Sequence, residues 1–245
     1  MNLNKLQQKF IVNGILLSPV LPFLYLQGQY TRLKIGKLPD AEGETSGEVI
    51  GKGEPINFLA IGESTIAGVG ARNHAEALTG QFAKYLSRQT ARTVCWHALG
   101  LSGITVQRTI DELVPQIPCV KFDVILIALG GNDVFQLSTP GKWRKGMTKL
   151  LDILRERYPD STIYLANVPM VRDFIGLPNP TRYVLSRVAK MQHFNTLDFV
   201  STYQNVHYYL PQGKFAEEHF SDGVHPSARG YDLWAEEMVR FFFKT

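Results

Sequence analysis

Ser64 stands in the glycine-rich segment GESTIAGVG (62–70), directly after the apolar run 56–61. A serine hydroxyl is a weak nucleophile until a base removes its proton, and an imidazole with an ordinary pKa near 6.5 can do this at neutral pH. Far along the chain, Asp222 and His225 lie in the segment SDGVHP. An aspartate at this spacing can bind the second nitrogen of the imidazole and hold the tautomer that a base needs. These residue types predict a serine nucleophile served by an Asp-His pair.

Two further segments can stabilise the negative oxygen that develops in acyl transfer. Gly103 lies in LGLSGIT (99–105), and Asn132 lies in GGND (130–133). Preorganised donors aimed at such an oxygen are worth roughly 3 kcal/mol each. We expect the N–H groups of Ser64 and Gly103 and the side-chain amide of Asn132 to act as these donors.

Each of these motifs taken alone has a simpler interpretation. Ser64 can cap a helix, the segment 130–133 can be a tight turn, and Asp222 with His225 can be a turn ahead of a helix. Their shared position, each following a strand, favours chemistry over three unrelated local roles.

The elements that must position these residues alternate along the chain. Short apolar runs predict strands over 56–61, 93–98, 122–129, 162–168 and 206–210. Amphipathic periodicity predicts helices over 74–89, 106–117, 142–158, 181–203 and 228–243. This alternation predicts an α/β domain, a doubly wound, flavodoxin-like sandwich with a five-stranded parallel sheet. In such sheets the chemistry lies beyond the carboxyl ends of the strands, which is where the four segments fall.

From about Ile56 to the C-terminus, the sequence resembles the SGNH (GDSL-type) hydrolase family, whose four blocks centre on Ser, Gly, Asn and His. The segments GESTIAGVGA, GGND and DGVHPSARGY are similar to those of its bacterial members. The resemblance implies a serine esterase or lipase in which Ser64, Asp222 and His225 form the catalytic triad and Ser64, Gly103 and Asn132 form the oxyanion hole. One position departs from the family pattern: Glu63 stands where the family usually has Asp. We expect it to rearrange the hydrogen bonds of the loop.

The loop that follows the fourth predicted strand, 168–180, is long and partly apolar. We expect Met170, Phe174 and Ile175 to bind substrate there, although a hydrophobic plug of the core is an equal alternative. No cofactor is expected, since the glycines fit neither nucleotide-binding pattern. No metal is expected either, because the histidines lack ligand spacing and two cysteines are too few for a cysteine cluster.

The N-terminal segment, 1–35, is apolar and carries no charged residue from position 10 to 31. Such a run predicts a membrane anchor, spanning or lying in the interface, on a side that the balanced flanking charges do not decide. The alternative is an arm packed on the domain. Glycine and proline in 36–55 predict a linker, so we expect the hydrolase-like domain to occupy 56–245.

Composition narrows the function classes. The 245 residues are 44% hydrophobic and 20% charged with a net charge of +4, which fits a globular domain and excludes a disordered tail or a coiled coil. The basic residues are scattered, so no nucleic-acid partner is expected. The leading hypothesis is an ester hydrolase acting on acyl esters, including lipid-like or lysophospholipid substrates. The alternatives are an O-acetyl esterase on a cell-envelope sugar and a membrane-tethered binding module with an impaired site.

Overall fold

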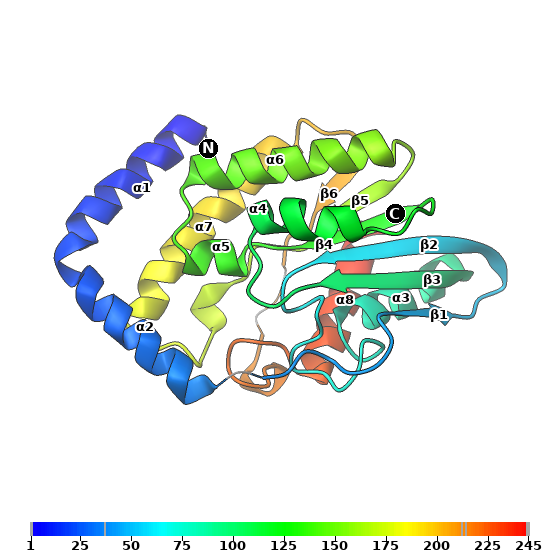
Figure 1. The fold of residues 1–245 in the computed structure, drawn as a ribbon, viewed down its shortest axis with the longest axis horizontal. Coiled ribbons are helices and arrows are strands. Elements are labelled where there is room, and N and C mark those ends of the chain that lie inside the picture. Colours follow the sequence, from blue (N-terminus) through cyan, green and yellow to red (C-terminus); the bar gives the residue numbers. More distant parts are fainter. Residues whose placement is uncertain (1, 37, 212, 214, 244–245) are drawn as a thin grey trace.

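A six-stranded sheet with helices on both faces forms the body of the protein in a computed structural model, which describes residues 2–36, 38–211, 213 and 215–243 (Figure 1). The strand order is β1-β3-β2-β4-β5-β6. The strands are β1 Ser46–Val49, β2 Gly53–Gly62, β3 Arg92–Gly100, β4 Val124–Ala128, β5 Thr162–Leu165 and β6 Val206–Tyr208. The five strands β2 to β6 are mutually parallel, which confirms the predicted parallel sheet.

The sequence of β2 shows how the sheet divides the core. Phe58 and Ala60 pack into the cluster on one face, whereas Leu59 and Ile61 pack into the cluster on the other. This alternation follows from the two-residue period of a strand. All five residues of β4 are buried, as expected for a central strand covered on both sides.

The segment 36–55 differs from the predicted linker. Ser46–Val49 forms β1 and pairs antiparallel with β3, so the sheet gains a sixth strand at its edge. The glycines permit close approach there. A Cβ on Gly47 would lie 2.5 Å from the ring of Trp96, and one on Gly51 would lie 2.3 Å from the backbone of Arg92. Glycine in this segment therefore lets the chain lie flat on its neighbour.

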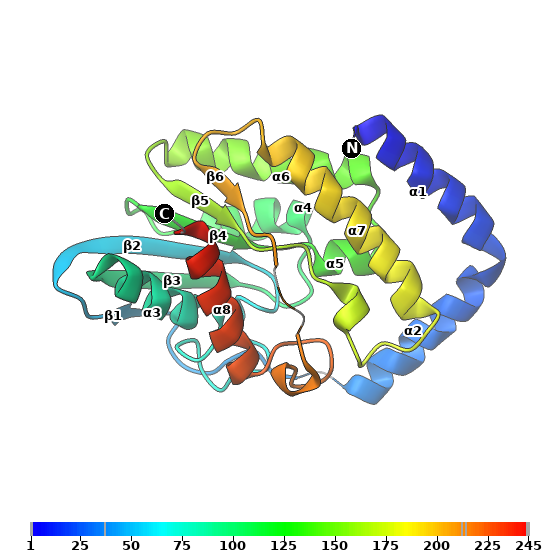
Figure 2. The same cartoon turned by 180° about the vertical axis from the view of Figure 1, so that it is seen from behind.

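Helices cover both faces of this sheet, and Figure 2 shows α8 from the side opposite to Figure 1. Leu78 of α3 and Tyr231 of α8 join the cluster on one face, while Trp143 and Leu150 of α6 join the other. The helices of the body are α3 Leu78–Thr90, α4 Val106–Arg108, α5 Gly131–Phe135, α6 Pro140–Arg157, α7 Thr181–Val200 and α8 Ala228–Phe242, with short 3-10 turns at Val171–Asp173 and Glu217–His219.

The helix predicted over 106–117 is irregular. After α4 the chain forms a π-helical turn, Thr109–Leu113, and then a 3-10 turn, Val114–Gln116. Pro115 lies in that last turn and has no N–H to continue the α-helical ladder, which gives a physical reason for the break.

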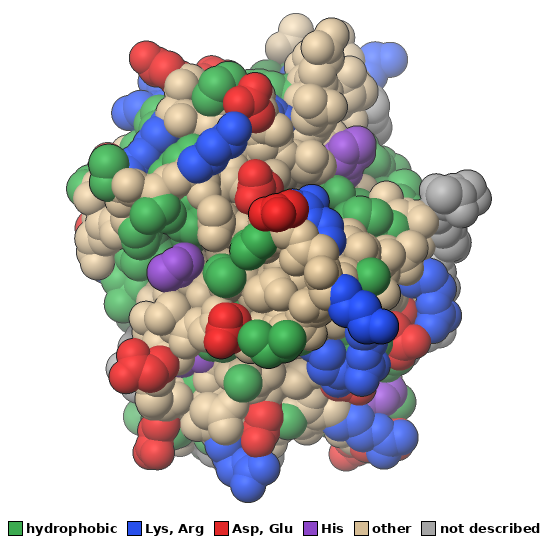
Figure 3. Space-filling model, turned by 90° about the vertical axis from the view of Figure 1, so that its right-hand side faces the viewer, with side chains coloured by type: hydrophobic (Ala, Val, Ile, Leu, Met, Phe, Trp, Pro, Cys, Tyr) green, Lys and Arg blue, Asp and Glu red, His purple; other side chains and the backbone are tan. Residues whose placement is uncertain are grey.

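Two helices precede the body: α1 Leu3–Leu17 and α2 Leu21–Ile35, joined by a 3-10 turn at Ser18–Val20. Together they form a bent arm along one side of the molecule, beside α6 and α7 (Figure 1). The stretch Leu3–Thr31 contains an 18-residue window with a mean hydropathy of 1.6 and is long and apolar enough to cross a membrane, a property that membrane anchors and signal sequences share. On the face shown in Figure 3, at the side away from this arm, charges of both signs are interspersed.

Candidate active site

Ser64 lies just beyond the carboxyl end of β2, on a turn fixed by backbone hydrogen bonds. Ile66 N–H donates to Glu63 O at 2.8 Å, and Val69 N–H donates to Ser64 O at 3.0 Å. Gly62 lets this turn lie against β4, because a Cβ there would be 2.1 Å from the carbonyl oxygen of Ala128. Ser64 is half-buried, and neither its hydroxyl nor its N–H has a hydrogen-bond partner among the residues that the structure describes. Both groups are free to meet a ligand.

Asp222 and His225 form a tight pair in the loop before α8. The aspartate Oδ2 lies 2.7 Å from His225 Nδ1, and its Oδ1 accepts the His225 backbone N–H at 2.7 Å and the Val224 N–H at 2.9 Å. Burial alone would raise the pKa of Asp222, but these hydrogen bonds outweigh it and hold the pKa below its usual value. An ionised Asp222 therefore accepts the proton on Nδ1 and leaves Nε2 of His225 unprotonated in the neutral ring.

The Ser64 turn and the His225 loop pack against each other. A Cβ on Gly70 would lie 2.2 Å from the carbonyl oxygen of Pro226, and the Tyr231 hydroxyl donates to Val69 O at 2.7 Å. The structure thus brings together two segments about 160 residues apart in sequence. Among the described residues, no hydrogen bond joins the Ser64 hydroxyl to the His225 ring.

Gly103 follows β3 and occupies the left-handed region, with φ of +82°. It is exposed, and a Cβ there would meet no atom within 4 Å. The backbone conformation, rather than crowding, is what glycine supplies at this position. The preceding residue is held from outside the loop, because Ser102 Oγ donates to Asp40 Oδ1 at 2.5 Å.

Asn132, at the start of α5, is bound to the carboxylate of Glu63. Glu63 Oε1 accepts the Gly131 N–H at 2.8 Å, while Oε2 accepts the Asn132 N–H at 2.9 Å and its side-chain Nδ2 at 2.5 Å. A Cβ on Gly131 would lie 2.9 Å from Glu63 Oε1, so glycine lets the carboxylate come close to this turn. Burial raises the pKa of Glu63 to about 7, a shift that the hydrogen bonds from Asn132 and Gly131 oppose. Glu63 therefore joins the Ser64 turn directly to the Asn132 turn.

A family model described as the GDSL-like Lipase/Acylhydrolase family matches residues 60–233, a range that contains all four segments. The chain belongs to this GDSL-like family. The resemblance inferred from the sequence is confirmed, and so is the class of enzyme, an esterase or lipase. No curated protein matches the sequence closely enough to count as a relative.

Solved structures share the fold of this GDSL-like enzyme at low sequence identity. An acetylxylan esterase from Geobacillus stearothermophilus is 16% identical, with a TM-score of 0.58 over 80% of this chain and 97% of that one. An extracellular lipase from Streptomyces rimosus is 14% identical, with a TM-score of 0.55 over 76% of this chain and 99% of that one. A G-D-S-L family protein from Desulfitobacterium hafniense is 15% identical, with a TM-score of 0.58 over 75% and 98%.

An apolar pocket that opens to solvent lies beside the Ser64 turn of the GDSL-like enzyme. Thr65, the neighbour of Ser64, lines it together with Val224 and Pro226, the two neighbours of His225. Met170 and Phe174, which the sequence analysis placed at substrate, also line it. Ile175 is 47% exposed and is not one of the described lining residues.

Sequence reasoning missed several residues of this site. Glu63 was expected only to disturb its loop, yet it holds Asn132; its departure from the family pattern was the available signal. Trp234 and Asn167 form part of the pocket wall and bond each other, indole Nε1 to amide Oδ1, at 3.2 Å. Trp234 belongs to the apolar stripe of α8, so no pattern in the sequence separates it from an ordinary core residue.

Metal-ligand clusters are not part of this site. Over the part of the chain that the structure describes, no three His, Cys, Asp or Glu side chains are grouped as a metal ion would require.

Proposed function

We propose that this chain is a serine carboxylic ester hydrolase that works through a covalent acyl-enzyme. Ser64 is the nucleophile, His225 is its general base and Asp222 orients the imidazole. The observation that carries the proposal is the Asp222–His225 pair, with Nδ1 bound at 2.7 Å, on a loop packed against the Ser64 turn.

The proposed reaction begins when Nε2 of His225 removes the proton of the Ser64 hydroxyl. The oxygen attacks the ester carbonyl, and the imidazolium then protonates the departing alcohol, leaving an acyl group on Ser64. Water, deprotonated by the same imidazole, releases the acid. Asp222 stays ionised throughout and stabilises the imidazolium, which agrees with the direction of its pKa shift.

Three donors are proposed for the oxyanion. The N–H groups of Ser64 and Gly103 make no hydrogen bond within the described part of the chain. Asn132 Nδ2 carries two hydrogens, of which Glu63 accepts one, so the other remains for substrate. Because the Glu63 carboxylate holds the amide in place, we treat it as a positioning residue of the oxyanion hole.

The pocket beside Thr65 supports an ester with an apolar acyl or alcohol part. Aromatic and aliphatic side chains make most of its wall: Pro169, Met170, Phe174, Phe215, Phe220 and Trp234. An apolar wall favours a medium acyl chain or a lipid-like ester over a bare acetyl group. The apolar N-terminal arm supports membrane association and hence a lipid-like substrate.

The test is fluorophosphonate labelling followed by an ester panel. The wild type should be labelled and should hydrolyse p-nitrophenyl octanoate faster than the acetate, whereas Ser64→Ala should lose both the label and the turnover. His225→Ala should lose turnover by several orders of magnitude while remaining folded by circular dichroism. Preference for the acetate would favour the O-acetyl esterase instead. A folded wild type without label or turnover would favour a binding module and refute the proposal.

A further inference from the structure

The N-terminal arm, α1 with α2, turns polar as well as apolar side chains toward the body and leaves large apolar side chains on its outer face. The residues turned toward the body recur at helical spacing and include several polar ones. They are Leu3, Leu6, Gln7, Phe10, Asn13 and Leu17 in α1, and Leu24, Gln27, Gly28 and Thr31 in α2. On α2 this inner stripe is mostly polar or small.

The outer face of the arm is apolar. Its large side chains are exposed to solvent, with Leu16 at 71%, Leu26 at 66% and Leu33 at 82%. Ile11, Ile15 and Phe23 are also more than half exposed. A continuous apolar surface of this kind on a protein marks an interaction site rather than ordinary exposure.

The charged residues in the sequence of the arm have one sign. The first acidic residue of the chain is Asp40, whereas Lys5 and Lys9 precede the uncharged stretch and Arg32, Lys34 and Lys37 follow it. Lys5 and Lys9 are exposed. An apolar segment flanked in the sequence by cationic residues complements a lipid surface that carries anionic headgroups.

Both halves of the arm are held on the body by polar contacts. On α1, Gln7 Oε1 accepts the N–H of Gly141 at the start of α6, at 3.1 Å. On α2, Gln27 donates to Asn179 O at 2.9 Å and accepts from the hydroxyl of Thr181 at 2.6 Å. If either helix crossed a bilayer, these inward polar groups would face hydrocarbon without partners.

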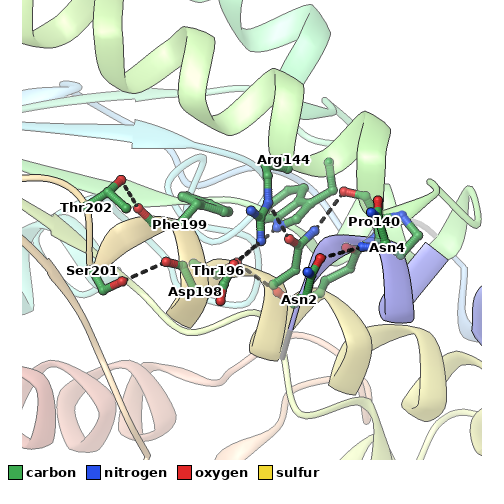
Figure 4. Close-up of polar contacts among 12 residues, drawn as sticks. Asn2, Asn4, Pro140, Arg144, Thr196, Asp198, Phe199, Ser201 and Thr202 are labelled. Atoms are coloured by element: carbon green, nitrogen blue, oxygen red, sulfur yellow. Dashed lines mark hydrogen bonds and ion pairs between the residues drawn. The ribbon is translucent and has the colours of Figure 1, made fainter.

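The two helices under α1 are joined to each other by polar contacts. Figure 4 shows the first residues of α1 beside α6 and α7, where Arg144 joins the two helices. Its guanidinium donates to Asn195 Oδ1 at 2.8 Å and to Asp198 at 2.6 Å, and Asn195 in turn donates to Pro140 O at 2.7 Å. The arm therefore lies against two helices that are fastened to each other.

We propose that the arm binds flat to one leaflet of a membrane containing anionic lipids, with its apolar face inserted and its inner face still docked on α6 and α7. This proposal concerns binding and does not depend on the esterase chemistry. Its consequence for catalysis rests on the proposed function and comes from where α2 is attached.

Gln27 connects the arm to the loop of the pocket. The N-cap of α7 is Pro180, which offers no side-chain cap, and Gln27 Oε1 accepts the first N–H of that helix, from Thr181, at 3.2 Å. Asn179 and Thr181 end the loop that begins at Val168 and carries Met170 and Phe174 into the pocket. A membrane-bound arm thus holds the loop that forms one wall of the pocket. Gln27 is the positioning residue for this loop.

The segment after α2 reaches the other side of the site. Ala41 N–H donates to Ala67 O at 2.9 Å, on the Ser64 turn, and Asp40 accepts the Ser102 hydroxyl beside Gly103. The arm is therefore attached to both rims of the site, so its insertion fixes how the pocket faces the lipid.

Binding is tested with full-length Ser64→Ala protein, so that catalysis plays no part. We expect it to sediment with vesicles of phosphatidylcholine and phosphatidylglycerol and much less with phosphatidylcholine alone. Leu16→Glu and Leu26→Glu should each abolish sedimentation. Ile50→Glu, the matched change at a 73% exposed site on the far end of the sheet, should not. Wild-type-like sedimentation of both arm variants, or none by the parent protein, would overturn the proposal. So would a dimer in lipid-free buffer that Leu16→Glu dissociates, because a second copy would then cover the arm.

Flat binding is tested by locking the docked state. In a Cys95→Ser, Cys119→Ser background, Gln7→Cys and Gly141→Cys are joined by a short bismaleimide. The locked protein should bind the vesicles as the unlocked one does. Loss of binding on locking would show that the arm must leave the body, as a spanning helix would.

The coupling is tested with Gln27→Ala. It should bind vesicles normally but raise KM for a soluble octanoyl ester about fivefold, the effect of a lost hydrogen bond. Gln27→Glu, which keeps the acceptor for Thr181, should recover most of the loss. An unchanged KM in Gln27→Ala would refute the coupling and leave the binding result intact.

Discussion

Glu63 and Asn132, 69 positions apart, are joined twice: Glu63 Oε2 accepts both the backbone N–H and the side-chain amide of Asn132, at 2.9 and 2.5 Å. One buried carboxylate thus fixes the orientation of an amide that we assign to the oxyanion hole. The extra methylene of glutamate, compared with the aspartate usual in the family, gives it the reach to bind the Gly131 N–H as well.

Replacing this carboxylate by an amide should weaken catalysis. In Glu63→Gln one carboxylate oxygen becomes an NH₂ donor, so either the Gly131 N–H or the two Asn132 donors lose their acceptor and the Asn132 turn is held less firmly. We expect kcat for p-nitrophenyl esters to fall by about 10²-fold, the usual effect of losing one oxyanion donor, with little change in KM. Glu63→Asp keeps the charge but shortens the side chain. Its kcat should lie between those of the wild type and Glu63→Gln. Full activity in Glu63→Gln would contradict the positioning role.

The stability of the protein should depend on the ionisation of Glu63. Its pKa is raised from 4.5 to about 7 by burial, so the folded state binds the proton more tightly than the unfolded chain does. The contribution of Glu63 to stability is then fully present below about pH 4.5 and is lost as pH rises through 7. Across that window, the free energy of unfolding of the wild type should fall by about 3 kcal/mol relative to Glu63→Gln. Urea unfolding of both proteins at pH 5 and pH 8 measures this, and a difference independent of pH would refute it.

Asp222→Asn should remove the acceptor that selects the tautomer of His225. The asparagine NH₂ or oxygen can still contact Nδ1, but the imidazolium loses its counter-charge. We expect kcat to fall by about 10⁴-fold with the fold unchanged. The control is Asp232→Asn, a partly exposed aspartate that pairs with Lys84 and should leave ester turnover within twofold. Equal effects of the two changes would mean that Asp222 has no special role.

Phe174→Ala should shift the chain-length preference. Phe174 is 9% exposed, lines the pocket and packs edge-on against Phe220 with ring centres 6.0 Å apart. Removing its ring takes apolar contact from a long acyl chain but nothing from an acetyl group, so kcat/KM for octanoate should fall about tenfold relative to acetate. Phe194→Ala, on the outer side of α7, is the matched control. A parallel loss on both esters would place the acyl chain elsewhere.

The sheet and the edge that carries the candidate site could be predicted from the sequence alone. The alternation of strand and helix predicted the parallel sheet, and the position of Ser64, Gly103, Asn132 and His225 after strand or loop signals predicted which edge they share. These features depend on local periodicity and on the general rule that parallel strands present their carboxyl ends together. Such information is contained in short stretches of sequence.

Other features were decided by contacts between distant segments. The glycine-rich stretch around Gly47 looked like a linker because its pattern is that of a loop, but the ring of Trp96 across the sheet makes glycine a requirement. The sequence showed Glu63 only as a departure from a motif, whereas its hydrogen-bond partners lie on another turn. The apolar run at the N-terminus determined that an apolar surface exists; which side of each helix faces outward depended on where Gln7 and Gln27 find partners. Composition and periodicity depend on residues that are neighbours in the sequence. The pairing of polar groups depends on residues that only the fold brings together, so the sequence pattern does not contain it.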